Sequence, residues 1–233
     1  MSLGTILKRS AAALWPSRVI LHGHAQGSRV GLTFDDGPHP QNTLPLLEVL
    51  ARAKATATFF LQGSQAERWP QLVREIHRQG HQVANHGFSH GSATKLPLLD
   101  FVQEVERTQA LLEGIVGCGL ARDFRPPFGD TTARSFLWLA GRGYRWIFWS
   151  HDSDDSLVRD PLELAQRVET LRLSAGDIAL FHEDYAHTLA AMPQILASLR
   201  SRELRAVRVD SLDGSAAEQN SPSAPTEQQG LRP

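Results

Sequence analysis

Short runs of β-type residues alternate with helical stretches along most of this chain, and that alternation constrains the fold more than any other feature. Runs typical of strands lie at residues 30–34, 57–61, 82–85, 145–149, 177–181 and 205–209, and a shorter run ends at Phe124. Between them, apolar residues recur at helical spacing over residues 43–54, 69–79, 99–115, 131–142, 161–173 and 188–200. Strands that alternate with helices in this way form βαβ units and a parallel sheet.

We therefore expect an α/β fold with about seven parallel strands. An irregular or incomplete (β/α) barrel is the first expectation, and an open doubly wound sheet is the alternative. The folded domain is expected to span residues 28–212, after an N-terminal lead-in over residues 1–27. Residues 213–233 are rich in Ser, Pro, Gln and Ala and have no apolar periodicity, so we expect this tail to be disordered.

Composition excludes several classes of protein. The 24 Lys and Arg residues balance 25 Asp and Glu residues, which leaves no basic footprint for nucleic acid. The single cysteine, Cys118, excludes an intramolecular disulfide and a multi-cysteine zinc site. The apolar run at residues 11–15 is shorter than the apolar region of a secretory signal peptide, roughly 7–15 residues, and shorter than a membrane span of about 20 residues. We therefore expect a cytoplasmic protein without an integral membrane segment, and its oligomeric state stays open.

Polar residues with catalytic potential follow five of the predicted strands, at the point where each strand ends. They are Asp35 and Asp36, His86 and His90, Arg125, Asp152 and Asp155, and His182. In parallel βα architecture the carboxyl ends of all strands meet at one face, where the loops build active sites. The sequence therefore predicts an enzyme with its site at this face.

Three of these side chains have the character of metal ligands. His86 and His90 have the i, i+4 spacing that lets two imidazoles of one helical turn face one cation. A third ligand can come from Asp35 or Asp36, and the other aspartate can then accept a proton. Asp-Asp-Gly is also a common turn sequence. Two histidines and one carboxylate leave open positions on zinc, or on a similar divalent ion, for water and substrate.

Five segments of the chain occur in the order of the motifs of the polysaccharide deacetylase family, and each resembles its motif. They are Thr33-Phe34-Asp35-Asp36-Gly37, His86-x-x-x-His90, Arg125-Pro126-Pro127-Phe128-Gly129, Asp152-x-x-Asp155 and Leu180-x-His182. The family is also called the NodB-homology or carbohydrate esterase 4 family, and the likeness spans about residues 28–212. It implies a TIM-like catalytic barrel and a metal-dependent hydrolase that removes N-acetyl groups from a sugar polymer, an oligosaccharide or a glycan precursor.

The resemblance also implies a role for each matching residue. Asp36, His86 and His90 would bind one divalent ion, zinc in the first place and cobalt or another divalent ion otherwise. Asp35 would act as the general base, and Arg125 would orient it.

On the acid side of the reaction, the resemblance makes His182 the general acid and Asp155 its supporting carboxylate. Leu180 would line the pocket for the acetyl methyl group. The backbone N–H of Phe128 would stabilise the oxyanion, and Asp152 is expected to contact the substrate.

Two positions depart from the family pattern. Ser156 follows Asp155 where a tryptophan usually walls the sugar groove, and Gly87 follows His86 where Ser or Thr is common. Ser156 keeps a first alternative open, the hydrolysis of another linear or cyclic amide. A second alternative is a catalytically silent carbohydrate-binding relative. The sequence argues against it, because every position with a proposed chemical role is filled. The other seven of the ten histidines, and Cys118, are expected to take no part in the chemistry.

Overall fold

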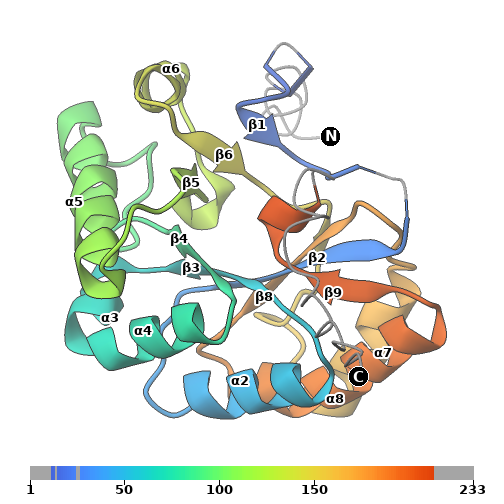
Figure 1. Cartoon of the computed structure of the whole chain (residues 1–233). Coiled ribbons are helices and arrows are strands. Elements are labelled where there is room, and N and C mark those ends of the chain that lie inside the picture. The colour runs from blue at the N-terminus through green and yellow to red at the C-terminus, as the bar shows by residue number, and fades with distance from the viewer. Residues whose placement is uncertain (1–11, 14, 25–26, 213–233) are drawn as a thin grey trace, which may run out of the picture.

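The structure of the chain is a computed structural model that describes residues 12, 13, 15–24 and 27–212. The predicted lead-in lies partly within these residues, and the predicted tail at residues 213–233 lies outside them. Strands and helices alternate along the described chain, as expected (Figure 1).

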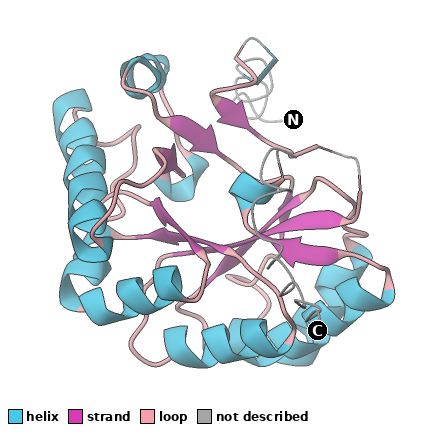
Figure 2. Ribbon diagram, in the orientation of Figure 1, coloured by secondary structure: helices cyan, strands magenta, loops and turns pink. Residues whose placement is uncertain are grey.

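The strands form one sheet in which every pairing is parallel. They are β1 (Val19–Ile20), β2 (Arg29–Asp35), β3 (Thr58–Leu61), β4 (Gln82–Asn85), β5 (Asp123–Phe124), β6 (Arg145–Ile147), β7 (His151–Asp152), β8 (Ile178–His182) and β9 (Arg205–Val207). Their order is β1-β6-β5-β4-β3-β2-β8-β7, and β9 pairs with β2. Within the described residues no ladder joins β1 to β7, so the curled sheet is an incomplete barrel (Figure 2), which confirms the expected fold.

Two strands were not predicted, which brings the sheet to nine strands. β1 and β7 have two residues each, too few for a strand pattern to be recognised in the sequence. Asp152 was expected in a loop after a strand at residues 145–149. That expectation is wrong, because β6 ends at Ile147 and Asp152 itself pairs with Leu180 of β8.

Helices surround the strands on the outside of the curled sheet (Figure 1). They are α2 (Thr43–Arg52), α3 (Gly63–Arg68), α4 (Pro70–Arg78), α5 (Leu98–Val116), α6 (Ala133–Gly141), α7 (Pro161–Thr170) and α8 (Ala186–Ser201). The 3₁₀ helices are η1 (Pro127–Gly129) and η2 (Val209–Ser211), and Val209 of η2 packs with Phe60 and Ile147 in an apolar cluster apart from the main one. Six of the α-helices were predicted. The six-residue α3 was not, because its sequence has no apolar periodicity. Among the described residues, no helix combines the length and the apolar character needed to span a bilayer.

The side chains of β2 point alternately to its two faces, and this alternation separates the apolar core from the candidate site. Val30, Leu32 and Phe34 share one face of the strand and join the main apolar cluster, which includes residues of α2 and α8. Thr33 and Asp35 point to the opposite face, the interior of the curled sheet, where both contact one buried arginine. The strand therefore holds a polar interior in place by burying its other face under helices.

Candidate active site

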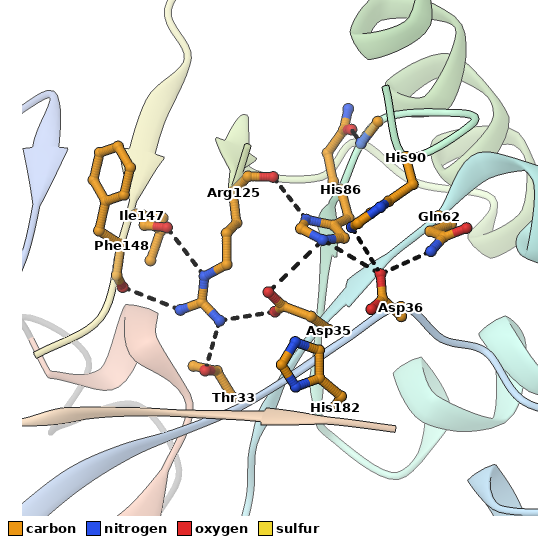
Figure 3. Close-up of polar contacts among 12 residues, drawn as sticks. Thr33, Asp35, Asp36, Gln62, His86, His90, Arg125, Ile147, Phe148 and His182 are labelled. Carbon is orange, nitrogen blue, oxygen red and sulfur yellow. Dashed lines mark hydrogen bonds and ion pairs between the residues drawn. The ribbon is translucent and has the colours of Figure 1, made fainter. Parts of the chain in front are cut away.

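The carboxyl ends of four strands deliver most of the polar residues that the sequence singles out. Asp35 is the last residue of β2 and lies opposite His182, the last residue of β8. His86 directly follows β4, and Arg125 directly follows β5. Figure 3 shows that their side chains converge on one space at this end of the barrel.

Asp35 and Asp36 reach the same space although they are neighbours in the sequence. Successive side chains of an extended strand point to opposite faces. Asp36, however, has a left-handed backbone with a φ of 71°, which ends the alternation. As a result, His86 Nε2 lies 3.7 Å from Asp35 Oδ2 and 3.5 Å from Asp36 Oδ1. A left-handed aspartate costs on the order of 1 kcal/mol, and such strain is typical of functional sites.

His86 and His90 lie in a loop after β4, so the predicted helical turn is wrong. The loop reverses through the left-handed residues Gly87, with a φ of 77°, and His90, with a φ of 61°. The two imidazole centroids nevertheless lie 5.1 Å apart, close enough to share a cation. The structure therefore brings together the two histidines that the spacing singled out, but in a different local geometry.

The amino end of α3 holds this loop. The N–H groups of Gly63 and Ser64 donate to the carbonyl oxygens of Gly87 and Phe88, at 2.8 and 2.9 Å. Gly63 is required here because a Cβ at this position would lie 2.4 Å from Phe88 Cδ2 and 2.5 Å from Thr108 Oγ1. The loop that carries both histidines is thus positioned by backbone contacts to a rigid element.

The ligand atoms of Asp36, His86 and His90 all lie within 4.8 Å of one another. Asp36 Oδ1 lies 3.2 Å from His90 Nε2 and 3.5 Å from His86 Nε2. Ligands about 2.0–2.1 Å from a tetrahedral ion are roughly 3.3–3.4 Å apart, so the spacing fits a metal ion. His86 Nδ1 lies 2.7 Å from the carbonyl oxygen of Arg125. A carbonyl only accepts, so Nδ1 carries the proton and Nε2 is free for a metal.

The charge states of these ligands also suit a cation. Burial raises the pKa of Asp36, but His86 and His90 lower it, and the net pKa lies below its ordinary value. Burial lowers the pKa of His90, and this outweighs the opposing effect of Asp36. An ionised carboxylate and a neutral imidazole are the forms that bind metal.

Gln62 is a site residue that was not predicted. Its Nε2 donates to Asp36 Oδ1 at 2.7 Å, the same oxygen that faces both histidines (Figure 3). Gln62 directly follows β3, so its place after a strand was the available signal.

Arg125 is completely buried beneath Asp35. Its Nη1 donates to Asp35 Oδ1 at 2.8 Å and to Thr33 Oγ1 at 2.7 Å. Its Nε and Nη2 donate to the carbonyl oxygens of Ile147 and Phe148, each at 3.1 Å. Burial lowers the pKa of Arg125, and Asp35 opposes that shift. All three guanidinium nitrogens donate hydrogen bonds, and the buried guanidinium therefore holds the Asp35 carboxylate in one orientation.

His182 is held by a fully buried carboxylate. Its Nδ1 lies 2.7 Å from Asp155 Oδ1, and its backbone N–H donates to Asp155 Oδ2 at 2.8 Å. The hydroxyl of Thr188, which was not predicted, donates to the same Oδ2 at 2.8 Å. Burial lowers the pKa of His182, but Asp155 reverses the effect and raises that pKa to about 9. The imidazole is therefore protonated at neutral pH, and its ring lies beside Asp35 and Asp36 (Figure 3).

The three predicted substrate contacts have different surroundings. Leu180 is buried on the same face of β8 as His182 and belongs to none of the apolar clusters of the described residues. Phe128 is 66% exposed, and its ring centroid lies 4.5 Å from that of His90. Asp152 Oδ1 accepts the backbone N–H of Asp154 at 3.0 Å, which fixes the local turn. A substrate contact by Asp152 stays a prediction.

Glu183, next to His182, braces the turn that carries both aspartates. Its carboxyl group is buried against the Thr43 hydroxyl and the N–H of His39. Burial raises the pKa of Glu183 to about 7. A Cβ at Gly37 would lie 1.8 Å from Glu183 Oε2, so the glycine permits this close approach.

Comparisons with known proteins agree with the geometry. A family model described as polysaccharide deacetylase matches residues 22–147. A peptidoglycan-N-acetylglucosamine deacetylase of Bacillus cereus is 32% identical, over 78% of this chain and 87% of the relative. A chitooligosaccharide deacetylase of Azorhizobium caulinodans is 31% identical, over 75% and 90%. The solved family 4 carbohydrate esterase from Streptomyces lividans, in complex with acetate, has a TM-score of 0.72 and 37% identity, over 77% of this chain and 92% of that chain.

Proposed function

Because the chain belongs to the polysaccharide deacetylase family, we propose that it removes N-acetyl groups from an N-acetylated glycan by metal-assisted hydrolysis. One observation carries the proposal. A metal triad, an aspartate held by a buried arginine and a protonated histidine held by a buried carboxylate meet at one end of the barrel. These are the groups that hydrolysis of an amide needs.

Asp36, His86 and His90 would hold the ion. Zinc suits this donor set best, because it accepts nitrogen and oxygen ligands in tetrahedral geometry. A divalent ion bound there supplies a Lewis acid that polarises the acetamide carbonyl and lowers the pKa of water toward about 7.

Asp35 and His182 divide the proton transfers between them. Asp35 takes a proton from the attacking water while Arg125 keeps its carboxylate in place. His182 gives its Nε2 proton to the amine nitrogen as the carbon–nitrogen bond breaks, since an unprotonated amine is a poor leaving group. The products are acetate and a free amino sugar, and Asp155 keeps His182 protonated for the transfer.

Two further residues would bind the acetyl group. The backbone N–H of Phe128 would stabilise the tetrahedral oxyanion, and one such donor is worth on the order of 3 kcal/mol. Leu180, buried beside His182 and outside the apolar core clusters, would contact the methyl group. The relatives act on peptidoglycan N-acetylglucosamine and on chitooligosaccharides, which supports an N-acetylglucosamine glycan as the substrate here.

Acetate release from N-acetylglucosamine oligomers and peptidoglycan fragments, with zinc, cobalt or manganese present, tests the proposal. We expect His86→Ala to lose both metal binding and activity. Asp35→Asn should keep the metal and lose activity by about 10²–10⁴-fold, the usual contribution of a general base.

Three results would count against parts of this proposal. An active Asp35→Asn enzyme would contradict the assignment of Asp35 as the general base. No acetate from any substrate with any metal would contradict the deacetylase function. Tight glycan binding without turnover would instead indicate a catalytically silent relative.

A further inference from the structure

Two aromatic side chains stand beside the reacting groups. Phe128 lies against His90, next to the metal triad. Tyr185 lies beside His182, the proposed general acid, and the two ring centroids are 5.6 Å apart. Phe128 is largely exposed and Tyr185 is half-buried, so both offer some ring surface to a ligand at the site.

The ring of Tyr185 is held in place by His187. It stacks on His187 at 5.2 Å between centroids, with an angle of 14° between the planes. His187 Nε2 in turn lies 2.7 Å from the carbonyl oxygen of Asp155. Asp155, whose side chain supports His182, therefore also holds His187, the residue on which Tyr185 stacks. A ring fixed before binding loses little conformational entropy when a ligand arrives.

Tyr185 has no evident part in the core. It belongs to none of the apolar clusters, and no hydrogen bond from the described part of the chain reaches its hydroxyl. On the loop that carries Asp155, the next residue is the exposed Ser156, whose side chain offers no ring. Tyr185 is therefore the aromatic surface in contact with His182.

We propose that Tyr185 is a specificity-determining residue whose ring packs on the pyranose ring of the N-acetylated sugar; this rests on the proposed deacetylase function. A pyranose ring presents a face of C–H groups, which an aromatic ring covers well, and the tyrosine hydroxyl can bond a sugar hydroxyl. Phe128, beside His90, supplies a second apolar surface to the same ligand.

The experiment compares Tyr185→Ala and Tyr185→Phe on two substrates. One is an N-acetylglucosamine tetramer, and the other is 4-nitrophenyl acetate, which has an acetyl group but no sugar. We expect Tyr185→Ala to raise KM for the tetramer about tenfold, and Tyr185→Phe, which keeps the ring, to stay within about twofold of the original chain. Hydrolysis of 4-nitrophenyl acetate and zinc affinity should be unchanged in both variants.

Trp138→Ala is the control for the loss of an aromatic side chain, because Trp138 of α6 packs against an apolar cluster, and α6 carries none of the site residues. It should leave KM for the tetramer unchanged. An unchanged KM in Tyr185→Ala would overturn the proposal. A shift of the basic limb of kcat/KM for the tetramer in Tyr185→Ala would also overturn it, because the ring would then act on His182 and not on the sugar.

Calorimetric binding of the tetramer separates this proposal from the proposed function. If the original chain binds the tetramer without releasing acetate, the deacetylase function fails. Weaker binding by Tyr185→Ala would still support the sugar contact, and equal binding would overturn it. Tyr185→Leu, a second variant without a ring, is expected to behave as Tyr185→Ala does.

Discussion

At the scale of single residues, Asp35 and Asp36 are chemically alike but have different neighbours. Asp35 accepts a hydrogen bond from the buried Arg125, whereas Asp36 accepts one from Gln62 and faces both histidines. A guanidinium fixes the orientation of a base, and a neutral amide leaves the charge of a ligand available to a cation. In the proposed mechanism these neighbours therefore assign proton transfer to Asp35 and metal binding to Asp36.

Replacing Gln62 by leucine should weaken zinc binding about tenfold, because hydrogen-bonding partners of metal ligands typically contribute 10–100-fold to affinity. The cause is the loss of the donor that orients Asp36 Oδ1. Competition with a chelator measures the affinity. Gln79→Leu, which removes a bond to Glu75 on α4, serves as the control. Equal zinc affinity in the Gln62 variant and the original chain would contradict this role.

The pH profile should depend on Asp155. The pKa of His182 is raised to about 9, so the acid is protonated at neutral pH and activity is lost as the pH rises through that pKa. A bound dication opposes the imidazolium charge, so the basic limb of kcat/KM should lie at or below pH 9. In Asp155→Asn the partner that raises the pKa of His182 most is gone and burial still lowers that pKa, which should move the limb to lower pH. An unmoved limb would show that His182 does not titrate there.

At the scale of elements, the short helix α3 positions the loop that carries His86 and His90. Its first two N–H groups bind carbonyl oxygens of that loop. Its first residue, Gly63, has no room for a side chain. The barrel supplies the strand ends, and this contact between an element and a loop is one of those that hold His86 and His90 in place.

Gly63→Ala should lower the free energy of unfolding by about 1–3 kcal/mol, as overpacking typically does, and should also weaken zinc binding. Gly114→Ala is the control, since Gly114 is exposed within α5 and a Cβ there would meet nothing within 4 Å. It should raise the free energy by about 0.5–1 kcal/mol, because alanine favours helix. Urea unfolding measures both. An unchanged Gly63→Ala protein would show that the loop accommodates the methyl group.

At the scale of the whole molecule, the proposed metal joins loops that follow two different strands, β2 and β4. An ion that binds only the folded chain stabilises it by about 2.7 kcal/mol at one hundred times Kd. For a chain of this size that corresponds to a rise of roughly 5–10 °C in Tm. Thermal unfolding with and without zinc should show this rise in the original chain and none in His86→Ala. An equal rise in both would place the ion elsewhere.

Much of this architecture was predictable from sequence because it rests on local periodicity. The alternation of strands and helices predicted the incomplete parallel barrel. The positions of Asp35, His86, Arg125 and His182 after strands predicted one site at one end. β1, β7 and α3 were not predictable, because two residues, or a helix without an apolar face, carry no periodic signal. The domain boundaries and the cytoplasmic location stay predictions.

The sequence by itself determined the order of the strands along the chain and the residue types at their ends. Only the tertiary structure decided how those residues act on one another. The left-handed backbone at Asp36 turns its carboxylate toward His86 and His90, and Gln62 donates to that carboxylate from a third segment of the chain. Periodicity reports which face of an element is buried, whereas contacts between loops depend on how whole elements are placed around a shared core.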